Sequence, residues 1–178
     1  MEDRTMKYAA IAVATFAFAF PVHVAASQDS VSTSDRSFIA MVSQGGMFEV
    51  KAGQLGADQG STQDIRDQGT TEAHDHALVG SKLKSIASGA GIDIPDTLNA
   101  SFQKKFDDLK ALSGTAFDAE YLRDMEAIHA KDGAAFAKEA KSGTDLKLMA
   151  FAAETHRIVE RHIGELQALG VAMPASQR

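Results

Sequence analysis

Hydrophobic residues recur at spacings of three and four along nearly all of the chain beyond residue 34, which is the periodicity of one face of an α-helix. In the first such stretch the stripe consists of Phe38, Met41, Val42, Phe48, Ala52 and Leu55. Comparable stripes predict five helices, over residues 35–58, 62–88, 96–112, 116–141 and 145–169. No segment alternates polar and apolar residues with a period of two, and β-branched residues do not cluster, so strands are not expected.

Short polar and glycine-containing segments mark the ends of these helices. Ser34 is expected to cap the first helix, and "SGAGIDIP" (residues 88–95) ends the second with glycines and a proline. The segments "SGT" (113–115) and "SGTD" (142–145) separate the later helices, and the second of them supplies an N-cap.

Four of the five predicted helices are long, about 35–40 Å each at a rise of 1.5 Å per residue. They form two pairs with short turns, and the 26 residues from Gly89 to Gly114 join the pairs. Because this connection contains the short helix, it can run along the molecule as a crossover. The sequence therefore predicts an all-α four-helix bundle over residues 35–170, with the extra helix in the crossover between its second and third helices. Residues 27–34 are expected to form a flexible lead-in and residues 171–178 a tail.

The first 26 residues have a different character. Lys7 is followed by an apolar run from Tyr8 to Phe20 and then by small residues ending at Ala26. This is the layout of a secretory signal peptide, with cleavage expected after Ala26. The run is short for a membrane span because Pro21 and His23 break it. An uncleaved anchor is the alternative, and both hypotheses place the domain outside the cytoplasm, in the periplasm or cell envelope.

Composition narrows the function classes. The chain has 178 residues, 44% of them hydrophobic, and a formal net charge of −6. An acidic chain without a basic run is a poor ligand for nucleic acids, so no nucleic-acid partner is expected. The absence of cysteine excludes disulfides, thiolate metal ligands and cysteine nucleophiles. No membrane span is expected in the mature chain, and the sequence leaves homo-oligomers open.

Three histidines lie within the apolar stripes of three different long helices, namely His76, His129 and His162. Glu49 lies beside the stripe of the first helix. Measured along the helices from the first turn, Glu49 is about 17 Å down and His76 about 23 Å down, at 1.5 Å per residue. His129 is about 20 Å from either end of its helix, so these three side chains are expected at one level. His162 is nearer a helix end and is expected to share that level less well.

Two interpretations of these inward residues remain open. In one, Glu49, His76, His129 and His162 bind a transition metal. In the other, the histidines form a structural polar network with Glu49, Asp75 or water. His74 and His156 fall off the stripes and are expected to face solvent.

The spacing of Glu126 and His129 resembles the Glu-x-x-His pair of bundles that hold two metal ions. Such a site also needs about four acids and two histidines. The inward set predicted here has one acid and three histidines, so ferroxidase chemistry is disfavoured.

Four segments resemble the DUF4142 family, a domain of unknown function: "FIAMVSQGGMFEVKAGQL", "AHDHALVGSKLKSIA", "FDAEYLRDMEAIHAKDGAAFAKEAKSG" and "DLKLMAFAAETHRIVERHIGELQAL". The resemblance covers residues 34–169. Its most specific residues are the Gln44-Gly45-Gly46-Met47 run with Glu49, the Asp75-His76 pair, Tyr121-Leu122 with His129, Phe136, the Lys138-Glu139-Ala140 run and His162.

The resemblance implies a ferritin-like bundle in a protein exported by bacteria, often described as an outer-membrane protein and without an agreed activity. Relatives usually carry an apolar residue at the position of Glu126 and a second Asp-His pair where this chain has Ile128-His129. The resemblance therefore implies that Glu126 is not a ligand and that its spacing from His129 is a coincidence.

Two hypotheses for function follow. The first is a non-enzymatic exported bundle that acts in envelope maintenance, stress tolerance or binding. The second is a ferritin-like metalloprotein, with a redox role open to it, whose nitrogen-rich ligands favour zinc, copper or iron over magnesium or calcium. A hydrolase is disfavoured because the chain has no Gly-x-Ser-x-Gly, phosphate-loop or His-Glu-x-x-His motif.

Overall fold

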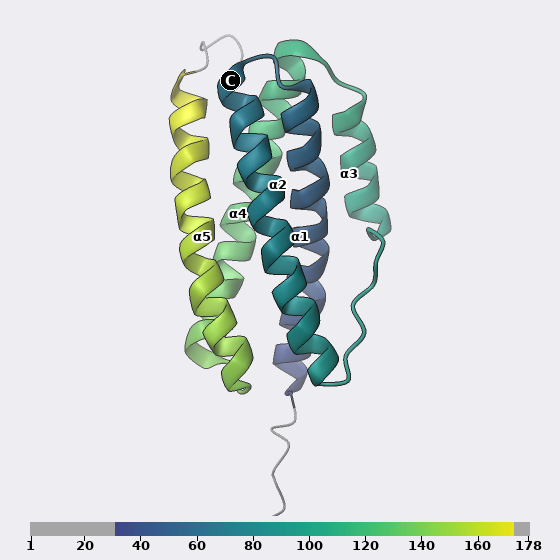
Figure 1. The fold of residues 1–178 in the computed structure, drawn as a ribbon, viewed down its shortest axis with the longest axis vertical. Helices are drawn as coiled ribbons and strands as arrows, with labels where there is room; N and C mark the ends of the chain where they lie inside the picture. Colours follow the sequence, from purple (N-terminus) through teal and green to yellow (C-terminus); the bar gives the residue numbers. More distant parts are fainter. Residues whose placement is uncertain (1–30, 173–178) are drawn as a thin grey trace, which may run out of the picture.

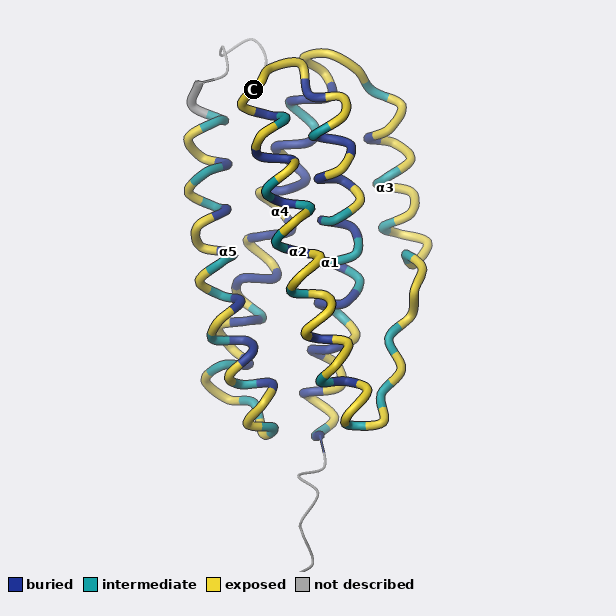
Figure 2. The backbone as a smooth tube through the Cα atoms, in the orientation of Figure 1, coloured by how far each residue is buried: buried dark blue, intermediate teal, exposed yellow. Residues whose placement is uncertain are grey.

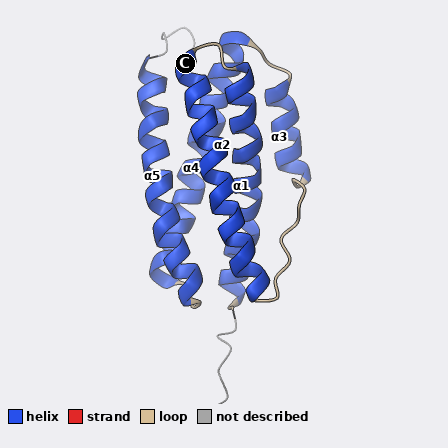
Figure 3. Cartoon of the chain, viewed as in Figure 1, coloured by secondary structure: helices blue, strands red, loops and turns tan. Residues whose placement is uncertain are grey.

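The computed structural model describes residues 31–172 and shows five helices there, without strands (Figures 1 and 3). They are α1 (Thr33–Gln59), α2 (Gln63–Gly89), α3 (Ala100–Lys110), α4 (Gly114–Ser142) and α5 (Leu146–Ala172). The predicted all-α class is confirmed. The predicted signal segment, most of the lead-in and most of the tail lie outside the described residues.

The four long helices form two antiparallel hairpins, α1–α2 and α4–α5, each closed by a short turn (Figure 1). The hairpins pack side by side, α1 against α4 and α2 against α5. The connection from α2 to α4 runs back along the outside of the bundle, and its helix α3 packs on α1 and α4 (Figure 1). The predicted four-helix bundle with a helix-bearing crossover is confirmed. A single long crossover also occurs in ferritin-like bundles, with which this topology is compatible.

Two helix starts differ from the sequence prediction. Ser32, not Ser34, caps α1, and it forms a capping box with Asp35. The crossover helix begins at Ala100 rather than at residue 96, because the side chain of Asn99 accepts a hydrogen bond from the backbone N–H of Phe102 and caps it there. In both cases a polar side chain two or more residues away from the expected position satisfies the free N–H groups of the first turn.

An aspartate fastens the two hairpins together at each end of the bundle. Asp35 of α1 accepts hydrogen bonds from the backbone N–H groups of Thr144 and Asp145, both at 3.2 Å, in the α4–α5 turn. At the other end Asp118 of α4 accepts one from the backbone N–H of Ser61, at 3.0 Å, in the α1–α2 turn. Each turn is therefore held by a carboxylate of the opposite hairpin.

The hydrophobic core is divided into two clusters along the bundle axis, and buried positions follow the inward faces of all four long helices (Figure 2). One cluster, around Phe38, Phe136 and Phe151, lies toward the α4–α5 turn. The other, around Phe48, Phe117 and Tyr121, lies toward the α1–α2 turn. None of the helices in residues 31–172 combines the length and apolarity needed to cross a membrane.

Candidate metal centre

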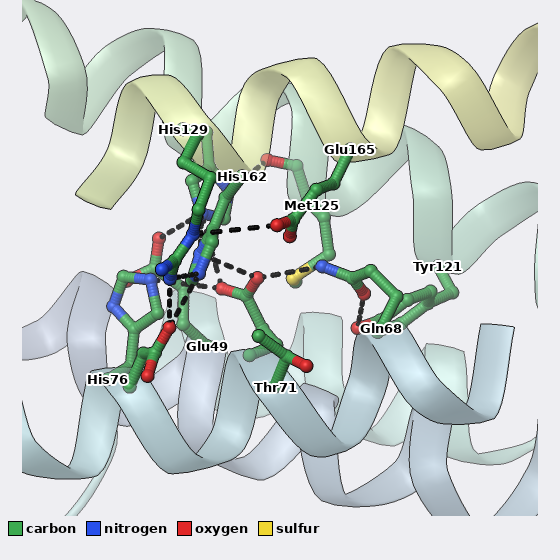
Figure 4. A network of polar contacts seen from close by, with 12 residues as sticks. Glu49, Gln68, Thr71, His76, Tyr121, Met125, His129, His162 and Glu165 are labelled. Carbon is green, nitrogen blue, oxygen red and sulfur yellow. Dashed lines mark hydrogen bonds and ion pairs between the residues drawn. The ribbon is translucent and has the colours of Figure 1, made fainter. Parts of the chain in front are cut away.

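Four buried side chains meet in the middle of the bundle: Glu72 and His76 on α2, His129 on α4 and His162 on α5. One ligand atom from each lies within 4.8 Å of the others. Figure 4 shows His76, His129 and His162 turned toward one another, with Glu49 of α1 beside them. In the part of the chain that the structure describes, this is the only group of at least three such residues close enough to hold one ion.

His76 is held between two glutamates. Its Nδ1 lies 2.9 Å from Oε2 of Glu49, and its Nε2 lies 3.1 Å from Oε1 of Glu72. The first contact has the geometry of a buried ion pair between α1 and α2. The second lacks hydrogen-bond geometry, so Nε2 has no hydrogen-bond partner within the described residues.

His129 is fixed by its own helix. Its Nδ1 lies 2.8 Å from the carbonyl oxygen of Met125, one turn earlier in α4, so Nδ1 carries the proton and donates it. Its Nε2 points into the cluster, 3.2 Å from Oε1 of Glu72 and 3.3 Å from Nδ1 of His162. A backbone carbonyl therefore sets which nitrogen of this ring faces inward.

His162 is fixed from the outer side by Asp75, whose Oδ2 lies 3.1 Å from Nε2 of His162. Arg161 also approaches this nitrogen, at 3.0 Å, and forms an ion pair with the same carboxylate oxygen. We assign the proton to Nε2, because without it the nitrogen lone pair would face the carboxylate oxygen of Asp75. Nδ1 then faces inward, 3.1 Å from Oε2 of Glu72.

Glu72 is the centre of the cluster and is completely buried. Its two oxygens face all three imidazoles, and Oε2 also accepts a hydrogen bond of 2.9 Å from the side-chain amide of Gln68. The hydroxyl of Tyr121 in turn donates to the amide oxygen of Gln68 (Figure 4). A chain of hydrogen bonds thus fixes the orientation of the central carboxylate.

The three rings share one design. Each uses one nitrogen to contact an acceptor outside the cluster: a carboxylate of Glu49, a carbonyl of Met125 or a carboxylate of Asp75. Metal-binding histidines are usually held in this way, because the outer acceptor fixes the ring and leaves the other nitrogen free to ligate. The inner nitrogen must carry either a second proton or a lone pair available to a cation.

The acidic residues favour the protonated rings. Burial disfavours the charged form of His76, but Glu49 and Glu72 outweigh it and raise its pKa well above the usual value. Burial opposes the charged form of His129 too, and Glu72 again raises the net pKa. Burial would raise the pKa of Glu72, but the three imidazoles hold it well below its ordinary value. Protons and a metal cation therefore compete for the same inner nitrogens.

The spacing of the inner atoms also matches a metal site. Bonds of about 2.0–2.1 Å to nitrogen in a tetrahedral zinc site place neighbouring ligand atoms about 3.3 Å apart. Three of the inner separations are 3.1, 3.2 and 3.3 Å. Three nitrogens and one oxygen are ligands that suit zinc, copper or iron.

The structure brings the four residues named from the sequence into one place. His76, His129 and His162 face one another, and Glu49 contacts His76 from outside with Oε2, while Oε1 lies 3.8 Å from His129. The expectation that His162 lies off the common level is wrong. Its helix continues to Ala172, three residues beyond the expected end, so His162 is farther from the helix end than the sequence suggested. Metal binding by these residues stays a prediction.

Glu72, the central acid, was missed because only the apolar stripe and its histidines were followed. Its spacing to His76 places both on one helix face, a signal that the sequence does contain. Glu126 is exposed, as the resemblance implied. His74 is exposed as expected, whereas the side chain of His156 is only 26% exposed and lies near Glu160.

The fold and the cluster define the class of protein: an antiparallel helical bundle whose two hairpins enclose a buried group of histidines and glutamates. The chain belongs to the family described as "Domain of unknown function (DUF4142)", whose model matches residues 21–169. No curated protein and no solved structure matches the chain.

Proposed function

We propose that this chain is a metal-binding protein that holds one transition-metal ion between Glu72, His76, His129 and His162. The observation that carries the proposal is the arrangement of the three rings, each with one nitrogen committed to an outer acceptor and the other directed at Glu72. Oε1 of Glu72 and Nε2 of His76, which face each other without a hydrogen bond, are atoms that a cation would satisfy.

The role that fits this set is binding rather than catalysis. Four protein ligands close a tetrahedral site, whereas catalytic zinc sites keep one position for water or substrate. The four inner residues are all at most 2% exposed, so substrate has no direct access to them. Storage, delivery or structural use of zinc or copper agrees with this geometry, and an iron site remains an outcome of the test.

Thermal unfolding with and without metal tests the proposal. A ligand at a hundredfold excess over its dissociation constant stabilises the folded form by ~2.7 kcal/mol. For a domain of this size that corresponds to a rise in Tm of about 5–10 °C. We expect this rise for the wild type with zinc, copper(II) or iron(II) relative to chelator, and no rise for His129→Ala.

His74→Ala is the matched control, because His74 is a histidine of the bundle that lies exposed on its surface. This variant should keep the full metal-dependent rise. If the histidines formed only a structural network, His129→Ala would lose about 1–3 kcal/mol for the group left unpaired, equally with chelator and with metal. That result, together with a wild type that no metal stabilises, would refute the proposal.

We also propose that the mature protein acts in the periplasm or cell envelope. The support is the sequence of the first 26 residues, a basic start followed by a short apolar run and small residues. We expect the mature chain to begin at or near Ser27. N-terminal sequencing of the protein from the envelope fraction tests this expectation, and full-length protein in the cytoplasm would contradict it.

A further inference from the structure

A cavity of about 530 Å³ lies between α1, α2 and the crossover segment at Ile94–Asp96. This volume is within the range of pockets that bind small molecules, about 300–1,000 Å³. Its walls are mainly apolar and include Val42, Met47, Val50, Val79, Leu83, Ile94, Pro95 and Phe136. Although His76 forms part of the wall, most of the cavity lies outside the metal centre, on the side of the α1–α2 hairpin that the crossover covers.

Two glycines keep the cavity open. Gly46 on α1 and Gly80 on α2 both line it, and a Cβ atom added at either position would meet no atom within 4 Å. Elsewhere in the hairpin glycine allows close contact: a Cβ at Gly69 would lie 2.5 Å from the backbone nitrogen of Ala57. A glycine inside a helix costs about 1 kcal/mol relative to alanine. Close helix contact explains that cost at Gly69, whereas at Gly46 and Gly80 the gain is empty space.

The charged groups at the cavity are mainly positive. Lys51 on α1 and Lys84 on α2 line it from opposite sides, with Asp96 on the crossover as the one carboxylate among its lining residues. Within residues 31–172 neither lysine forms an ion pair, although Lys51 lies over the ring of Phe106 at 5.7 Å. Two free lysines beside an apolar cavity are notable in a chain with a net charge of −6.

We propose that this cavity binds a small amphipathic anion, a carboxylate with an unbranched apolar chain, whose head group lies near Lys51 and Lys84. The chain occupies the apolar space between Gly46, Gly80 and the crossover. Burial of the chain supplies most of the affinity, and the two ammonium groups select the charge of the head group. This site is separate from the metal proposal, and its ligand binds with chelator present.

Calorimetric titration of the full chain in chelator tests the choice of ligand. The probes are decanoate, decan-1-ol and decyltrimethylammonium, which share a chain and differ in charge. Decanoate should bind most tightly and the ammonium compound least. The double variant Lys51→Met, Lys84→Met should lose affinity for decanoate by about tenfold or more, because a hydrogen bond to a charged group is worth about that factor. Its affinity for decan-1-ol should not change.

Gly80→Leu tests the location. Its side chain would fill the cavity without meeting another atom at the Cβ, so the variant should fold and should bind decanoate at least about tenfold more weakly. Gly164→Leu on α5 is the matched control, since Gly164 is exposed and its Cβ would also meet nothing within 4 Å. This control should bind decanoate like the wild type. Equal binding of the three probes, no binding of decanoate, or full binding by Gly80→Leu would each overturn the proposal.

Discussion

At the scale of single residues, Glu72 controls the state of the cluster. It is the acid that faces all three imidazoles, and its negative charge is the shared counter-charge for their protonated forms. Each outer acceptor serves one ring, whereas Glu72 serves His76, His129 and His162 together. Its loss should therefore change both the stability of the metal-free protein and its affinity for a cation.

Glu72→Gln should destabilise the metal-free protein, and more at pH 5 than at pH 9. Removing one partner of a buried ion pair costs about 3–5 kcal/mol, and that cost applies only while the histidines are charged. Because the pKa values of His76 and His129 are raised, the charged forms predominate at pH 5. Urea unfolding at the two pH values measures the difference, with the exposed Glu126→Gln as control. An equal loss at both pH values would show that Glu72 does not balance imidazolium charge.

At the scale of elements, α1 and α2 are in close contact in one half of their hairpin and separate in the other. Near the turn, the helices touch through glycines: a Cβ at Gly53 would lie 2.7 Å from the backbone nitrogen of Ala73. In the other half the cavity separates them. The same substitution should therefore have opposite effects in the two halves.

Gly69→Ala should destabilise the protein by about 1–3 kcal/mol, the usual cost of forcing an extra group into a packed contact. The added Cβ would meet backbone atoms of α1, which cannot move aside as a side-chain end could. Gly80→Ala, in the open half, should instead stabilise the protein by about 0.5–1 kcal/mol through helix propensity. Chemical denaturation of both variants measures the two changes. If Gly69→Ala were also stabilising, the close contact near the turn would be refuted.

At the scale of the whole molecule, the buried acids and histidines should make the metal-free protein most stable in mild acid. Burial raises the pKa of Asp132 to about 7, with a further contribution from Glu49, and burial next to Asp35 raises the pKa of Glu139 to about 7. The folded form then binds more protons than the unfolded chain between about pH 4 and pH 7, so stability falls as the pH rises through that window.

The raised pKa values of His76 and His129 extend this decline above pH 6.5, the ordinary histidine value. On the acid side, burial of Asp35 is outweighed by its hydrogen bonds to Thr144 and Ser32, and its pKa is lowered to about 2. Its contribution is complete above about pH 4 and is lost as the pH falls toward 2. Calorimetry in chelator should therefore give a higher Tm at pH 5 than at pH 8.

Metal should reverse this order, because each inner nitrogen must lose its proton to ligate. The rise in Tm caused by zinc should be larger at pH 8 than at pH 5. A rise that did not depend on pH would place the ion on groups other than the inner imidazoles.

Much of this arrangement could be predicted from the sequence, because it depends on local periodicity. Apolar spacings of three and four located every helix, and the same stripes carried His76, His129 and His162 into the interior. Glu72 was missed since a charged residue inside a stripe reads as solvated until facing imidazoles from other helices are known to balance it. The cavity depends on how the crossover lies over α1 and α2, a long-range contact that no local pattern encodes.

The cluster takes half of its inner residues from each hairpin: Glu72 and His76 from α1–α2, His129 and His162 from α4–α5. An ion held there would join two units that the chain itself connects only through the long crossover. Its release would then require the hairpins to part, so the lifetime of the bound ion would follow the opening rate of the bundle rather than the strength of single ligand bonds. A protein built in this way can keep its metal for long periods in dilute surroundings and release it quickly once a partner or a surface separates the hairpins.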